Sequence, residues 1–120
     1  MRPYTEEEKA KLTKRELARL RRIFKNIPED KRQLVEGLIQ EAAFMRATLE
    51  EARAIIDRDG VIENFEQGAQ RFLREHPATK VYASMVNRYT TVCNRLLELL
   101  PTSEARESKD ELMAFVKRAG

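Results

Sequence analysis

The chemistry that this sequence offers most clearly is the binding of phosphate groups by a cluster of cations near its N-terminus. Residues 9–25 contain eight Lys or Arg residues and a single acidic residue, Glu16. Cations on one face of a helix can neutralise the phosphates of a nucleic-acid backbone, and the counterions that they release make such binding salt-dependent. We therefore predict DNA binding by Lys9, Lys11, Lys14, Arg15, Arg19, Arg21, Arg22 and Lys25.

Two other interpretations of the basic cluster stay open at this point. The first is a solvated basic helix face that binds nothing. The second is a helix that lies on a membrane surface, but the segment has no Trp and only Leu17, Leu20 and Phe24 could insert. Phosphate contacts position a protein on DNA without reading its sequence, so no base-specific recognition is predicted.

The remaining residue types argue against catalysis and against a metal site. His76 and Cys93 are the only histidine and the only cysteine, which is too few for a zinc site of the usual kind. Cys93 lies in an apolar segment, where a buried and inert thiol is expected. No glycine-rich phosphate loop is present, so ATP hydrolysis is not expected. We therefore predict a protein that is not an enzyme and that uses no cofactor or metal.

The basic cluster lies on an expected first helix that begins at Thr5. Thr5 and Glu8 have the spacing of a capping box. An apolar stripe on the same helix is formed by Leu17, Leu20, Phe24 and Ile27. Pro28 then ends this helix and starts a second one, which should run to about Asp59 and stop at Gly60.

Two long rows of apolar residues with heptad spacing dominate the rest of the chain. The first row is Leu38, Ala42, Met45, Leu49, Ala52 and Ile56, and the second is Tyr82, Met85, Tyr89, Val92, Leu96 and Leu99. Such spacing places one continuous apolar seam on each of two helices, which we expect to fold back on each other. The second long helix should run from Pro77 to Pro101. Between the two helices, residues 61–76 could form either a small β-hairpin that turns at Gln67-Gly68 or a loop.

The predicted fold class is all-α, in one domain of 120 residues. It consists of a basic N-terminal helix or arm (1–27), a long antiparallel helical hairpin (28–101) with the possible β-hairpin in it, and a C-terminal part (102–120). That last part is expected to be a polar linker followed by a short helix that Ser108 caps. No apolar run approaches the roughly 18 residues of a membrane-spanning helix, so no such helix is expected, and no membrane is among the predicted partners.

Both long helices carry more apolar side chains than one helix–helix contact can cover. A second copy of the chain is the simplest cover for the surplus, and the alternative is that the two terminal helices fold back over it. We therefore predict a homo-oligomer. Its expected interface residues are Phe44, Met45, Leu49, Ile55, Tyr82, Met85, Val86, Tyr89, Cys93, Leu97 and Leu100.

Several sequence blocks follow one another in a characteristic order. Residues 43–49 read Ala-Phe-Met-Arg-Ala-Thr-Leu in an expected long helix, and Gly60-Val61 follows as a turn. Next come an expected helix that starts at Pro77, with Val81-Tyr82 and Asn87-Arg88-Tyr89, and a final Leu-Leu-Pro. In this order the blocks resemble the small terminase subunits of tailed phages, in the short type found in phages of Gram-positive bacteria. The resemblance covers roughly residues 34–101.

This resemblance implies a non-catalytic component of a genome-packaging motor. Small terminases form ring-like oligomers, recognise double-stranded viral DNA and deliver it to the large terminase subunit, an ATPase and nuclease. They act in the cytoplasm of the infected bacterial host. The amphipathic C-terminal residues Leu112, Phe115 and Val116 would then suit docking to the large subunit, or they could simply cap the hairpin.

The chain departs from many small terminases in one respect: 27 residues precede Pro28, too few for a separate helix-turn-helix domain. Two other functions stay open as alternatives to packaging. One is a helical-hairpin adaptor that does not bind DNA, and the other is a small DNA-binding regulator.

Overall fold

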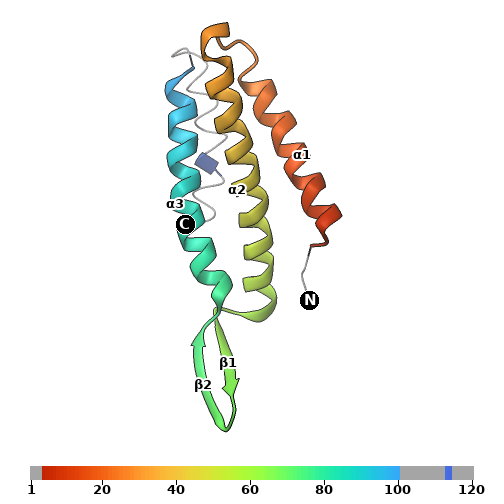
Figure 1. Ribbon diagram of the computed structural model, residues 1–120, viewed down its shortest axis with the longest axis vertical. Helices are drawn as coiled ribbons and strands as arrows, with labels where there is room; N and C mark the ends of the chain where they lie inside the picture. Colours follow the sequence, from red (N-terminus) through yellow and green to blue (C-terminus); the bar gives the residue numbers. More distant parts are fainter. Residues whose placement is uncertain (1–3, 101–112, 115–120) are drawn as a thin grey trace.

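Three helices and one small β-hairpin make up the computed structural model, which describes residues 4–100 and 113–114 (Figure 1). In chain order the elements are α1 (Glu6–Ile23), a single 3₁₀ turn η1 (Glu29–Lys31), α2 (Arg32–Asp59), β1 (Ile62–Gln67), β2 (Gln70–Glu75) and α3 (Pro77–Glu98). Helix α2 lies between α1 and α3, and the β-hairpin extends beyond the end of the α2–α3 pair (Figure 1). The architecture is therefore mainly helical.

The helix boundaries follow from local sequence signals. The Thr5 hydroxyl accepts a hydrogen bond from the Glu8 backbone N–H at 3.1 Å, and the Glu8 carboxylate accepts one from the Thr5 N–H at 3.4 Å. This is the predicted capping box. Gly60 ends α2 with a φ of 84°, a conformation that favours glycine. At the start of α3, the ring of His76 accepts a hydrogen bond from the Ala78 N–H at 3.1 Å, and Pro77 occupies the first turn.

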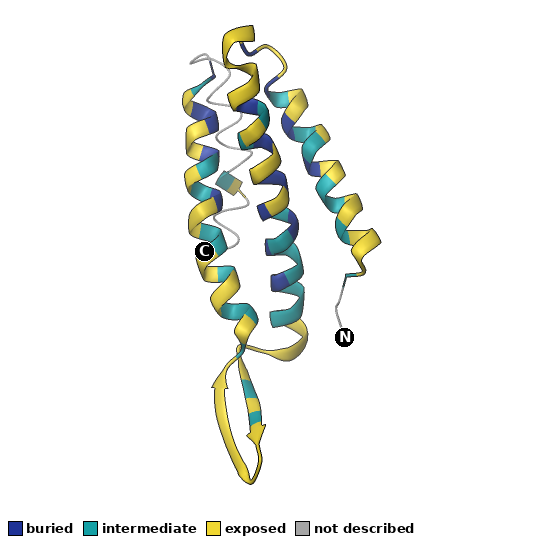
Figure 2. Ribbon diagram, viewed as in Figure 1, coloured by how far each residue is buried: buried dark blue, intermediate teal, exposed yellow. Residues whose placement is uncertain are grey.

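The core lies where α1 and α3 pack against α2, and the two heptad rows line it. From α2, Ala42 and Leu49 are fully buried, and from α3, Tyr89 and Leu96 are fully buried. Helix α1 adds Leu20 to the same cluster. Figure 2 shows these buried positions along the facing sides of the helices, with exposed residues on their outer sides. The two predicted apolar seams are therefore confirmed as the contact between the long helices.

The connection between α2 and α3 is a β-hairpin, so the all-α assignment was too narrow and the hairpin alternative is confirmed. Strands β1 and β2 pair antiparallel from Ile62↔Glu75 to Gln67↔Gln70. Gly68 opens the two-residue turn with a φ of 62°, as a type II′ turn requires. The irregular alternation in residues 61–76 arises because this hairpin has no buried face to specify a strict pattern.

Candidate nucleic-acid interface

Helix α1 is anchored by one side, and this fixes which of its cations face solvent. Leu20 is fully buried. Phe24, the first residue after the helix, is also part of the core, with 3% of its surface exposed. Glu16 is also buried, and its carboxylate lies 3.7 Å from Nη1 of Arg46 on α2. Because a helix turns by about 100° per residue, the side of α1 opposite Glu16 and Leu20 must face away from α2.

Three of the eight predicted DNA-binding cations form ion pairs within the chain. Lys9 Nζ lies 3.3 Å from a carboxylate oxygen of Glu51 on α2. Arg19 donates to Glu16 within α1, with an Nε–oxygen distance of 2.7 Å. Arg21 pairs with Glu36 on α2, where Nε lies 3.0 Å from the carboxylate. The pairs of Lys9 and Arg21 join α1 to α2, and all three pairs reduce the charge that these cations can offer to a ligand.

The other five cations are exposed and have no ion-pair partner among the described residues. They are Lys11, Lys14, Arg15, Arg22 and Lys25, and we call them the basic stripe. The spacing of Lys11, Lys14, Arg15 and Arg22 places them within about a third of the circumference of α1, on the side opposite the buried Leu20. Lys25 follows in the turn after the helix. From Lys11 to Arg22 the stripe is about 16 Å long, which matches the axial rise of about five phosphates on one DNA strand.

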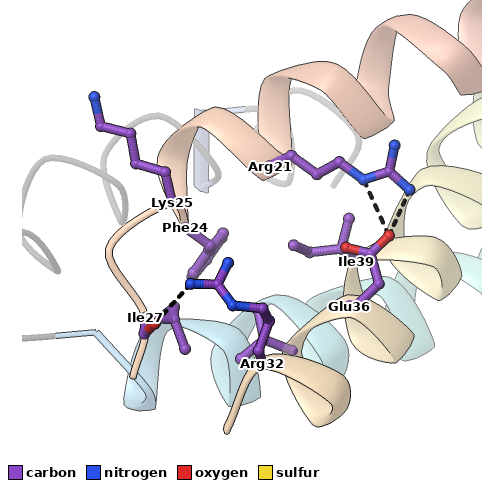
Figure 3. A pocket seen from close by; sticks show the side chains of 8 residues that line it. Arg21, Phe24, Lys25, Ile27, Arg32, Glu36 and Ile39 are labelled. Atoms are coloured by element: carbon purple, nitrogen blue, oxygen red, sulfur yellow. Dashed lines mark hydrogen bonds and ion pairs between the residues drawn. The ribbon is translucent and has the colours of Figure 1, made fainter. Parts of the chain in front are cut away.

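A shallow pocket lies beside the end of the basic stripe, where the chain turns from α1 into α2 (Figure 3). Ile39 contributes apolar lining, and Arg21 reaches across the pocket to Glu36. The hydrogen bond from the Arg21 guanidinium holds the pKa of the Glu36 carboxyl below its usual value. Arg32 Nη2 donates to the Ile27 carbonyl at 3.4 Å and so closes the turn. These contacts join the end of α1 and the following turn to the first turns of α2 at the surface.

A second group of exposed cations lies on α3 and was not predicted from the sequence. Lys80, Arg88 and Arg95 are exposed and have no ion-pair partner among the described residues. Their spacing of eight and seven residues places them on one side of the helix. This spacing was visible in the sequence, but the apolar heptad row of the same helix is the stronger pattern.

The predicted oligomer-interface residues fall into two groups. Six of them belong to the core of the single chain, namely Met45, Leu49, Tyr89, Cys93, Leu97 and Leu100. The others are half-buried or exposed: Ile55, Tyr82, Met85 and Val86 are half-buried, and Phe44 is 53% exposed. The contacts of α2 with α1 and with α3 bury much of the apolar surface that we predicted, from the sequence, to contact a second copy.

The surface available to another copy is therefore smaller than the sequence indicated. The predicted docking residues Leu112, Phe115 and Val116 lie outside the described part of the chain. Their assignment to the large subunit stays a prediction.

Within the described ranges 4–100 and 113–114, no cluster of three or more His, Cys, Asp and Glu side chains could hold a metal ion. The described helices include none that is both long and apolar enough to cross a membrane. Burial raises the pKa of the Cys93 thiol to about 11, so this thiol stays protonated at neutral pH. The candidate site that remains is the basic stripe.

No protein-family model matches this chain, and neither does any curated protein or solved structure.

Proposed function

We propose that this protein is the small terminase subunit of a tailed phage. In this role it forms a ring-like oligomer, binds double-stranded viral DNA through the basic stripe and delivers it to the large terminase subunit in the cytoplasm of the infected bacterium. The protein itself catalyses no reaction. The antiparallel α2–α3 pair forms the body of each subunit, and α1 carries the DNA contacts.

The observation that carries this proposal is the basic stripe on the solvent side of α1. Four cations without an ion-pair partner in the described part of the chain share one face of α1, and a fifth, Lys25, follows in the next turn. Lys9, Arg19 and Arg21, in contrast, are paired with carboxylates. A face with several uncompensated cations attracts a polyanion, because each phosphate contact releases condensed counterions. The packaging role itself rests on the resemblance of residues 34–101 to small terminases.

DNA binding is tested by removing three charges from the stripe. The variant with Lys11→Gln, Arg15→Gln and Arg22→Gln keeps the side of α1 that packs on α2. Its matched control, Lys80→Gln, Arg88→Gln and Arg95→Gln, removes the same charge from α3. We expect the stripe variant to bind duplex DNA more weakly in fluorescence anisotropy. Its plot of log affinity against log salt concentration should be shallower by about 3, which is about 0.9 for each lost phosphate contact.

Equal losses in the stripe variant and the control would indicate attraction by net charge alone and would remove the stripe as the site. No binding by the unmodified protein at low salt would favour the adaptor. A strong preference for a short palindromic site, by a dimer, would favour the regulator.

The packaging role is tested with a large terminase subunit from a phage that encodes this chain. We expect the small subunit to change the ATPase rate of the large subunit, and we expect light scattering to give one high-order species. A protein that binds DNA but stays a monomer or dimer and leaves the ATPase unchanged would contradict the terminase proposal.

A further inference from the structure

The β-hairpin leaves apolar side chains in solvent on both of its faces. Ile62 is 53% exposed and Leu73 is 69% exposed, and both lie on one face of the hairpin. On the other face, Phe65 and Phe72 pair across the strands with their ring centroids 5.1 Å apart, and Phe72 is 47% exposed. Figure 2 shows the hairpin as almost entirely exposed, beyond the end of the helices. The Arg74 guanidinium lies over the Phe65 ring, 3.9 Å from its centroid, whereas Ile62, Phe72 and Leu73 stay exposed.

A hairpin of this kind needs a further strand. Two-stranded sheets are marginally stable in water at best, because neither face is covered and each strand keeps one unpaired edge. The sheet of this protein has two strands, β1 and β2, each of six residues. Each free edge is therefore about 20 Å of backbone that can accept another strand.

The charges on the two strands determine which edges can meet. β1 carries two acidic residues and no basic one, Glu63 and Glu66, whereas β2 carries Arg71 and Arg74 beside a single acid, Glu75. Within the hairpin these charges already pair. Arg74 Nε lies 2.6 Å from the Glu63 carboxylate, and Arg71 Nε lies 3.3 Å from the Glu66 carboxylate.

Between two copies whose strands overlap fully, an antiparallel β1–β1 edge would place Glu63 opposite Glu66. A β2–β2 edge would place Arg71 opposite Arg74. Like charges on facing strands destabilise pairing, and opposite charges stabilise it. The β1–β1 and β2–β2 edges, which are the two edge pairings compatible with a two-fold dimer, are therefore disfavoured. A β1 edge against the β2 edge of another copy repeats the pairing already present in the hairpin.

We propose that β1 of one copy adds antiparallel to β2 of the next, so that the hairpins join the subunits head to tail. Such a contact joins two different surfaces, so each copy can bind one neighbour through β1 and another through β2. The series of copies ends when the rotation between neighbouring subunits closes a ring. In this arrangement the hairpin sets the order of the subunits, and the contact uses no residue of the basic stripe. The inference rests on the self-association in the proposed function and is independent of DNA binding.

The test is a variant in which the charges of the two strands are exchanged: Glu63→Arg, Glu66→Arg, Arg71→Glu and Arg74→Glu. Inside the hairpin each exchanged acid still faces an exchanged base, so the full-length chain should fold and assemble by itself. Against wild-type copies, however, each shared edge would place like charges together. We expect native mass spectrometry of the two co-expressed chains to show wild-type oligomers and variant oligomers, with mixed oligomers strongly depleted.

The control is co-expression of wild-type protein with a copy that carries only a mass tag, which should mix statistically. Statistical mixing of the exchanged variant with wild type would overturn the proposal. A folded variant that no longer assembles by itself, or a wild-type chain that stays monomeric, would overturn it as well.

DNA binding is measured separately, by fluorescence anisotropy on the same samples. An exchanged variant that binds DNA normally but mixes statistically would reject the hairpin contact alone. Loss of DNA binding in the stripe variant with its oligomer intact would leave the hairpin contact unaffected.

Discussion

Glu16 of α1 and Arg46 of α2 form an ion pair inside the helical body, with 3.7 Å between the Glu16 carboxylate and Arg46 Nη1. The side chains are 10% and 17% exposed, so water screens the pair poorly. Arg19 also donates to the Glu16 carboxylate, which therefore balances two guanidinium groups. An acid within the basic cluster thus orients α1 and leaves the basic stripe on the opposite side.

We expect Glu16→Gln to lower the free energy of unfolding by about 1–3 kcal/mol, because Arg46 would keep its largely buried charge and lose one of its acidic partners. Glu29→Gln is the matched control. It removes a carboxylate that is 86% exposed and pairs with Arg32 at the surface, and surface pairs contribute about 0–1 kcal/mol. Urea unfolding followed by circular dichroism measures both. A double-mutant cycle with Arg46→Met should show coupling, and additive effects would contradict the importance of the pair.

Two glycines should respond in opposite ways to substitution by alanine. Gly37 lies in α2, and a β-carbon there would meet no described side chain or neighbouring element within 4 Å, so Gly37→Ala should stabilise the protein by about 1 kcal/mol through helix propensity. Gly60 has a φ of 84°, so Gly60→Ala should destabilise it by about 1 kcal/mol. Thermal unfolding distinguishes the two. A loss of stability in Gly37→Ala would indicate that another helix packs closely against that position.

Asp59 should contribute to stability in a defined pH range. Hydrogen bonds from Arg58 and then from His76 lower its pKa from 3.8 to about 2. Because the folded state favours the charged carboxylate, the contribution is complete above about pH 4 and is lost as the pH falls toward about 2. Unfolding of wild type and Asp59→Asn, compared across this range, should show a difference that shrinks on acidification. A difference in stability that does not change with pH would contradict the lowered pKa of Asp59.

Cys93 should be unreactive in the folded protein. Its side chain is fully buried, and burial raises its pKa to about 11, so thiolate is scarce at neutral pH. We expect Ellman's reagent to modify the native protein far more slowly than the urea-unfolded protein. Cys93→Ser provides the background rate. Rapid modification under native conditions would mean that the contact between α2 and α3 opens frequently.

Much of the fold could be predicted because its signals are local. The Thr5–Glu8 capping box and Gly60 each fix a helix end through contacts within a few residues. The predicted start of α3 at Pro77 is confirmed, again because the signal lies within a few residues of the helix end. The hairpin at 61–76 was harder to predict, because both of its faces are exposed and its strands lack a regular apolar alternation.

The candidate site was predicted less completely than the fold. The sequence located the basic cluster on one helix, but it could not show which of the cations form ion pairs with acidic side chains. Lys9 meets Glu51 and Arg21 meets Glu36 across distances of 42 and 15 residues in the chain. Such pairs form only after α1 has packed against α2. They are therefore properties of the tertiary structure.

The sequence by itself determined the helices, the heptad contact between the two long ones and the concentration of positive charge near the N-terminus. These follow from periodicity, capping and composition, which act over one or two helical turns. Only the tertiary structure decided that α1 covers part of α2 and that Lys9 and Arg21 are paired there with glutamates of α2. The physical reason is that burial and charge compensation depend on which surfaces meet, and residues far apart in the chain supply those surfaces.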